Sequence, residues 1–304
     1  MNGAATTVTS TAHRVELSTG LGYLVRTWGP AITGAPATPP IVLIHGFLDA
    51  GTAWSEVAEA LAARFPERTL IAPDLRGHGD SDRVGAGGYY HFFDYVADLD
   101  ALVTVLALPT FDLIGHSMGG MVSSYFAGTR PERVRRLALL EGLGPPEAAL
   151  TGDALPHRTR AWLDAWARTR PQTERTMPNL DAAAARMCKH DHLLTPERAR
   201  LVADGLSREL AGGARQWKHD PVHLTPGPIP FRRDHAEPFW RAITAEALVV
   251  DGALSVMRLA DADAAARAGC IRNARHVVLA GAGHMLMRHQ PAALAALLGD
   301  FVAA

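Results

Sequence analysis

A serine between glycines is the residue of this 304-residue chain whose surroundings best suit chemistry. The segment GHSMGG, residues 115–120, follows the apolar run FDLI and precedes a stretch with helical spacing. It matches the pattern Gly-x-Ser-x-Gly, and a strand before it and a helix after it are the context this motif requires. The glycines leave room for a tight turn, and the start of the helix favours negative charge beside it. Ser117 is therefore the predicted nucleophile.

A serine hydroxyl is a weak nucleophile and needs a general base. Among the 14 histidines, His284 in AGAGHMLM has the most suitable context. It follows the last predicted strand at a glycine-rich turn and precedes the last predicted helix, so we expect it at the same sheet edge as Ser117. His116 is expected beside the nucleophile, in the wall of the substrate pocket, and His78 has no comparable context.

Apolar runs alternate with helical patterns in both the first and the last part of the chain. Continuous apolar runs typical of strands buried on both faces of a parallel sheet occur in IVLIHG (41–46), TLIAPD (69–74), FDLIGHS (111–117), VRRLALLEG (134–142), ALVVDG (247–252) and RHVVLAGAGH (275–284). Helical spacing separates most of these runs. The pattern predicts an α/β fold with a mostly parallel sheet flanked by helices.

The alternation stops from about Leu143 to Ala236, where the sequence predicts helices and loops but no strand. The simplest organisation is an α/β core of residues 1–142 and 237–304 with a helical cap, or lid, at 143–236. Such an insertion would lie over the carboxyl edge of the sheet, where open α/β sheets bind ligands. The aromatic residues of the cap that could pack it or face the substrate are Trp162, Trp217 and Phe231.

Four segments, HGFLDAGTAW, DLRGHGDSD, GHSMGG and GAGH, occur in an order and spacing that resemble the α/β-hydrolase superfamily. The resemblance is to its capped serine-hydrolase and epoxide-hydrolase-like branch, and it covers roughly residues 20–142 and 237–302. It implies an oxyanion hole formed by two backbone N–H groups, those of Phe47 and Met118.

The acidic member of a Ser-His-acid triad is absent from its usual position. In most of the family it follows the strand that is ALVVDG here, at the position of Ser255, and a serine cannot supply a negative charge. Glu141 ends the strand after the nucleophile helix, behind an apolar run where an unpartnered carboxylate would be costly. Some capped relatives take their acid from this strand. We therefore predict a triad of Ser117, His284 and Glu141, with Asp251 as the alternative acid.

The predicted nucleophile favours acyl transfer through an acyl-enzyme. The leading hypothesis is an esterase whose partner is a small-molecule acyl substrate, a small or medium carboxylic ester. Thioester, lactone or carbon–carbon bond hydrolysis would use the same groups. A ligand receptor with slow turnover on the same fold is the alternative from another functional class.

Composition excludes several other classes. The net charge is −1 with no basic stripe, which argues against nucleic acid binding. Cys188 and Cys270 have no CxxC partner, and there is no signal peptide pattern or long apolar run, so we expect a cytoplasmic protein without a membrane span. No cofactor motif occurs. We expect no metal site in WKHDPVH, because His219, Asp220 and His223 lie in a proline-flanked loop.

Overall fold

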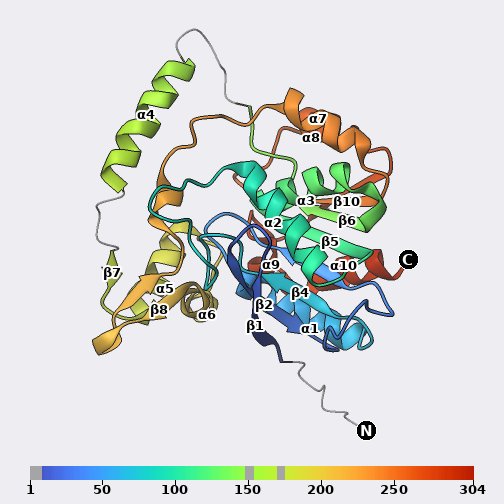
Figure 1. Ribbon diagram of the computed structural model, residues 1–304, viewed down its shortest axis with the longest axis horizontal. Coiled ribbons are helices and arrows are strands. Elements are labelled where there is room, and N and C mark those ends of the chain that lie inside the picture. Colours follow the sequence, from blue (N-terminus) through green and yellow to red (C-terminus); the bar gives the residue numbers. More distant parts are fainter. Residues whose placement is uncertain (1–8, 148–153, 170–174) are drawn as a thin grey trace.

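An eight-stranded sheet runs through the protein, whose computed structural model describes residues 9–147, 154–169 and 175–304 (Figure 1). Its strands are β1 (Thr11–Glu16), β2 (Gly22–Trp28), β3 (Ile41–Ile44), β4 (Leu70–Pro73), β5 (Phe111–His116), β6 (Val134–Leu140), β10 (Glu246–Gly252) and β11 (Ala274–Leu279). They lie in the order β1-β2-β4-β3-β5-β6-β10-β11. The β1–β2 and β2–β4 pairs are antiparallel and the others parallel. The predicted α/β fold with a mostly parallel sheet is confirmed.

Helices cover both faces of this sheet (Figure 1). One face carries α1 (Ser55–Arg64), α9 (Leu286–His289) and α10 (Pro291–Ala303), and the other carries α2 (Phe92–Val105), α3 (Met118–Thr129), α7 (Arg233–Ala242) and α8 (Asp261–Ala268). Successive strand side chains enter opposite cores: Ile41 and Leu43 join the first, Val42 and Ile44 the second. Burial on both faces explains why β3 is apolar at every position.

An insertion lies between β6 and α7. Its described residues form three α-helices, α4 (Ala154–Thr169), α5 (Leu180–His190) and α6 (Pro196–Leu206), and a small antiparallel sheet of β7 (Thr176–Met177), β9 (Arg215–Trp217) and β8 (Ser207–Glu209). The prediction that this region has no strand is therefore wrong. These strands have two or three residues each and show no apolar alternation, so their pairing leaves no readable pattern in the sequence.

The parts of the insertion differ in how they are packed. The α5–α6 pair and β7 enclose their own small core around Ala183, Leu194 and Ala199. In contrast, α4 has no buried residue and lies at the periphery in Figure 1. Within the described ranges, no helix is long and apolar enough to cross a membrane.

Polar contacts join the insertion to the carboxyl edge of the large sheet. Lys218 of the insertion forms an ion pair with Asp80 after β4, with 2.7 Å between Nζ and Oδ2. Asp191, between α5 and α6, accepts a hydrogen bond at 2.9 Å from Nε2 of His289 at the end of α9. The insertion therefore lies over the edge at which β3, β4 and β5 end.

Candidate active site

Ser117 lies in a strained turn between β5 and α3. Its backbone has φ +51° and ψ −118°, a conformation that non-glycine residues rarely adopt. Its N–H donates to the carbonyl oxygen of Leu140 at 2.8 Å, which fixes the turn against β6. A Cβ atom on Gly115 would lie 2.4 Å from the carbonyl oxygen of Gly119, and one on Gly119 would lie 2.4 Å from that of His45. The glycines are thus required by close backbone contacts around the serine.

His284 lies between β11 and α9, with both ring nitrogens in hydrogen bonds. Nε2 is 3.0 Å from Oγ of Ser117, and Nδ1 is 2.9 Å from Oε2 of Glu141. The structure thus brings the three predicted triad residues together. A carboxylate only accepts, so Nδ1 carries a proton and leaves Nε2 of the neutral ring as the acceptor for the serine proton.

His116 supports the loop of His284 instead of lining the pocket. It is buried, and its Nε2 donates to the carbonyl oxygen of His284 at 2.8 Å. Burial lowers its pKa well below the usual value, so the ring is neutral. The expectation that His116 forms the pocket wall is wrong, because the end of β5 turns its ring into the protein between Gly46 and the loop of His284.

Glu141 follows the last residue of β6 and is held on both carboxylate oxygens. Oε1 accepts from the N–H of Gly252 at 2.8 Å, and Oε2 accepts from Oγ of Ser255 at 2.8 Å as well as from His284. Its side chain is only 3% exposed. Burial alone would raise the pKa of Glu141, but the hydrogen bonds from His284, Gly252 and Ser255 outweigh burial and lower it. The carboxylate is therefore charged at neutral pH.

Asp251, the alternative acid, lies on β10 and bonds a different histidine. Its Oδ2 is 2.8 Å from Nε2 of His276, and it makes no hydrogen bond to His284 in the described chain. Burial raises its pKa, and the nearby charge of Glu141 raises it further. The geometry therefore favours Glu141 over Asp251 as the partner of His284.

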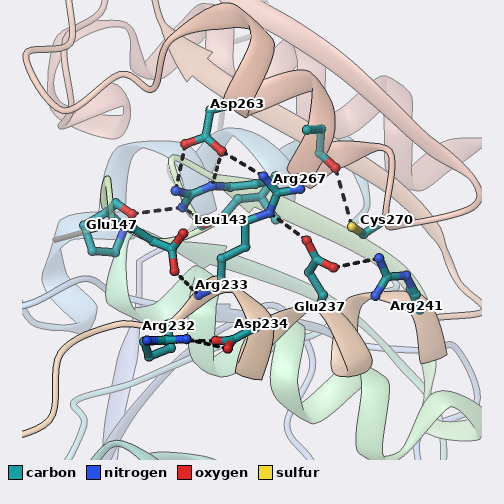
Figure 2. Close-up of polar contacts among 12 residues, drawn as sticks. Leu143, Glu147, Arg232, Arg233, Asp234, Glu237, Arg241, Asp263, Arg267 and Cys270 are labelled. Carbon is teal, nitrogen blue, oxygen red and sulfur yellow. Dashed lines mark hydrogen bonds and ion pairs between the residues drawn. The ribbon is translucent and has the colours of Figure 1, made fainter. Parts of the chain in front are cut away.

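The backbone turn that follows Glu141 is held by a buried arginine. Arg267 of α8 donates through Nη1 to the three carbonyl oxygens of residues 143–145, at 2.8, 3.1 and 2.9 Å. Asp263, one helical turn earlier, accepts from its Nε and Nη2. Figure 2 shows Arg233 of α7 reaching the same carboxylate. The guanidinium therefore fixes the point at which the chain leaves the core just beyond Glu141.

A cavity of about 200 Å³ opens beside Phe47 and Met118, the residues expected to form the oxyanion hole. Met118 is the first residue of α3, so its N–H has no acceptor within the helix. The N–H of Phe47 donates to no acceptor among the described residues. Both groups are thus available to an oxygen atom of a ligand.

The other walls of the cavity come from two segments that the sequence analysis missed as pocket residues. Residues 89–95 supply Tyr89, Tyr90, Phe92 and Tyr95, and residues 222–227 of the insertion supply Val222, His223, Thr225 and Gly227. The run YYHFFDY, with five aromatic residues in seven, was the signal that could have found the first segment. The second segment carries no such signal.

The three aromatic cap candidates are not among the residues that line this cavity. Trp162 packs edge-on against Tyr89, with 5.6 Å between ring centroids. Trp217, on β9, packs against the α5–α6 core, and the ring of Phe231 lies 5.2 Å from the guanidinium of Arg267. Their placement in the pocket is wrong because each ring is held against the protein by local packing.

The histidines and the aspartate of WKHDPVH do not gather around one point that could hold a metal. Asp220 accepts from the hydroxyl of Tyr90 at 2.7 Å and from the N–H of Val222 at 2.9 Å. Burial lowers the pKa of His223 to about 3, and its ring stacks on Tyr90 with 3.8 Å between centroids. No group of three or more His, Cys, Asp or Glu side chains in the described ranges could hold a metal ion.

Comparisons with known proteins agree with this architecture. A family model for the alpha/beta hydrolase fold matches residues 39–200. The chain is 38% identical over 120 residues to a soluble epoxide hydrolase of Corynebacterium sp. (strain C12), covering 38% of each protein. It is 38% identical over 105 residues to a 2-hydroxy-6-oxo-2,4-heptadienoate hydrolase of Pseudomonas putida, covering 34% of this chain and 38% of that protein. The chain thus spans well under half the length of these curated relatives.

A solved structure is similar over nearly the whole chain. The thioesterase domain from the curacin biosynthetic pathway superposes with a TM-score of 0.81 and 27% identity, covering 95% of this chain and 99% of that domain. The similarity therefore includes the insertion as well as the large sheet.

Proposed function

Because this chain belongs to the alpha/beta hydrolase fold family, we propose that it is a serine hydrolase that cleaves a small or medium carboxylic ester. The observation that carries the proposal is the line of hydrogen bonds from Ser117 through His284 to Glu141, with distances of 3.0 and 2.9 Å. A nucleophile, a base and an orienting carboxylate in this arrangement are the components of acyl transfer through an acyl-enzyme.

In the first half of the reaction, Oγ of Ser117 forms a bond to the acyl carbon while its proton passes to Nε2 of His284. Glu141 holds Nδ1–H and stabilises the imidazolium that results. The collapse of the tetrahedral intermediate breaks the bond to the leaving oxygen, which takes the proton from Nε2. Water then attacks the acyl-enzyme by the same route and releases the acid.

The negative charge that develops on the carbonyl oxygen needs fixed donors. The backbone N–H groups of Phe47 and Met118 have no other acceptor in the described chain and border the cavity, so they are suited to this role. Each donor of this kind contributes about 3 kcal/mol of transition-state stabilisation. Because both are backbone groups, only the geometry of the two turns determines their position.

A thioester is the second candidate substrate. It is favoured by the likeness to a thioesterase domain, at 27% identity over 95% of this chain. The same nucleophile, base and oxyanion donors would cleave it, with a thiol as the leaving group in place of an alcohol.

The test is hydrolysis of p-nitrophenyl butyrate by the wild type and by Ser117→Ala, with folding checked in both. We expect measurable turnover by the wild type and a loss of roughly 10³-fold or more in the variant. Hydrolysis of butyryl thioesters alone would favour the second candidate. A wild type inactive on both, whose Ser117 also resists labelling by a fluorophosphonate, would contradict the proposal.

A further inference from the structure

One hydroxyl group in the cavity wall has no hydrogen-bond partner among the described residues. The hydroxyl of Tyr90 donates to Asp220, and that of Tyr89 accepts from Oγ1 of Thr225 at 3.1 Å. Tyr95 also lines the cavity, but its hydroxyl forms no hydrogen bond with any described residue. The residue is nevertheless only 3% exposed. A ligand that fills the cavity would displace water from this hydroxyl, so a ligand that offers it a hydrogen-bond acceptor avoids the cost of leaving it unpaired.

The chemistry of Tyr95 makes it a donor to a ligand. It lies in the first turn of α2, with its ring 6.0 Å from the guanidinium of Arg76 and 6.4 Å from the ring of His78. Burial raises its pKa well above the usual value for tyrosine, so the phenol keeps its proton. The proton of this hydroxyl has no acceptor among the described residues, so an acceptor on the ligand would pair with it.

The remaining walls favour a flat, unsaturated group. The rings of Tyr90 and His223 line the cavity and lie against each other, with 3.8 Å between centroids. The buried ring of His78 supports His223 at 4.2 Å but does not line the cavity. Phe47 stands edge-on to His223, with 5.8 Å between centroids and an interplanar angle of 83°. Aromatic walls of this kind gain from offset stacking and edge-to-face contact with another ring.

The cavity has room for about one ring. A cavity of about 150 Å³ binds benzene in another protein, and this one has about 200 Å³. That volume leaves room for one small substituent. The cavity also borders Phe47 and Met118, so its occupant belongs to the molecule whose ester group is at Ser117.

Resting on the proposed function, we propose that the substrate is an ester with one six-membered aromatic ring that carries an oxygen substituent. The ring occupies the cavity, and the hydroxyl of Tyr95 donates to the oxygen substituent. Tyr95 is thus a specificity-determining residue for oxygen-substituted aromatic esters.

Two matched sets of esters test the substrate class. Methyl esters of phenylacetic, 3-methoxyphenylacetic, 4-methoxyphenylacetic and cyclohexylacetic acid vary the acyl half, and acetates of the corresponding alcohols vary the other half. In the set whose varied half enters the cavity, we expect kcat/KM for the phenyl ester to exceed that for the cyclohexyl ester by about threefold to tenfold. The better methoxy isomer should exceed the phenyl ester by about fivefold. Equal values for phenyl and cyclohexyl esters in both sets would overturn the proposal.

A pair of tyrosine variants tests the hydrogen bond. In Tyr95→Phe the ratio of kcat/KM between the methoxy and phenyl esters should fall to about one, because the donor is lost. Tyr125→Phe is the matched control. That residue is also buried and its hydroxyl also has no partner in the described chain, but its ring stacks on Phe239 outside the cavity. Retention of the methoxy preference by Tyr95→Phe, or its loss in Tyr125→Phe, would show that the assignment is wrong.

Binding to Ser117→Ala separates this inference from the proposed reaction. Dissociation constants of the same esters for this variant need no turnover, and they should follow the order expected for kcat/KM. Binding in that order with no hydrolysis by the wild type would reject the reaction and keep the ring site. Hydrolysis by the wild type without any such order of binding would reject the ring site and keep the reaction.

Discussion

The ends of β6 and β10 each carry a carboxylate at the carboxyl edge of the sheet, but their surroundings act on the two groups in opposite ways. Glu141, after β6, accepts three hydrogen bonds, and these lower its pKa. The side chain of Asp251, on β10, hydrogen-bonds only His276 among the described residues, and burial and the charge of Glu141 raise its pKa. The first site is built to hold a negative charge beside His284, while the second disfavours one.

Ser255 stands where most of the family has its acid, and here it supports the acid at the end of β6 instead. It lies in the loop after β10 and donates its hydroxyl proton to Oε2 of Glu141, the same oxygen that bonds His284. The N–H of Gly252, at the end of β10, donates to the other oxygen. The loop after β10 therefore supplies hydrogen-bond donors instead of a carboxylate of its own. The donors around Glu141, more than the strand that carries it, keep this carboxylate charged beside His284.

The largest expected effect comes from Glu141→Gln. An amide at this position can offer His284 an N–H in place of an acceptor, which would favour the wrong tautomer of the imidazole. We expect kcat for p-nitrophenyl butyrate to fall by roughly 10² to 10⁴-fold, as measured by steady-state kinetics on folded protein. Unimpaired turnover would mean that another group orients His284.

A smaller effect is expected from moving the carboxylate back to β10. Oγ of Ser255 lies 2.8 Å from Oε2 of Glu141, and that oxygen lies 2.9 Å from Nδ1 of His284. A carboxylate at position 255 would therefore approach the imidazole. We expect the double variant Glu141→Ser, Ser255→Asp to regain about tenfold in kcat over Glu141→Ser alone, read as a double-mutant cycle.

Ser255→Ala in the wild-type background is the control for that swap. It removes one donor to Glu141 but leaves the charge and the other two hydrogen bonds in place. Its kcat should fall by no more than about tenfold. If Ser255→Ala lowered kcat as much as Glu141→Gln, or if the double variant regained no kcat, the carboxylate of Glu141 would not be what distinguishes the end of β6 from the end of β10.

The residues that the sequence predicted well are those whose position follows from local pattern. Ser117 lies where an apolar strand meets a helix, and His284 follows the last apolar strand, so the edge common to both could be inferred without coordinates. Glu141 was inferred partly by the same rule, because a charge at the end of an apolar run needs a partner, and partly from the resemblance to capped relatives that take their acid from this strand. The structure brings these three side chains within hydrogen-bond distance.

The residues that the sequence predicted poorly depend on how distant segments pack. His223 reaches the cavity because residues 221–224 form a short helical turn that lies against Tyr90, and no local pattern specifies that contact. Trp162 and Trp217 were expected either to pack the cap or to face the substrate, and local pattern does not decide between the two; Trp217 packs within the insertion and Trp162 packs against Tyr89. A pocket wall formed by two segments far apart in the sequence needs the tertiary structure to be seen.

The smallest expected effect comes from Asp251→Asn, which should leave kcat within about twofold of the wild type. This substitution is expected to change how the free energy of unfolding depends on pH. The pKa of Asp251 is raised in the folded protein from 3.8, so its contribution to stability is greatest at low pH and is lost as the pH rises through the folded pKa. Relative to the wild type, Asp251→Asn should therefore become more stable as the pH rises.

Glu141→Gln should show the opposite trend. The pKa of Glu141 is lowered in the folded protein from 4.5, so its contribution to stability is full above 4.5 and is lost as the pH falls through the folded pKa. The destabilisation caused by Glu141→Gln should therefore grow as the pH rises. Urea unfolding of the wild type and both variants at several pH values between about 3 and 7 measures both trends. Stability differences that move in the same direction for the two variants would mean that the two carboxylates are not held in opposite ways, whatever their effects on turnover.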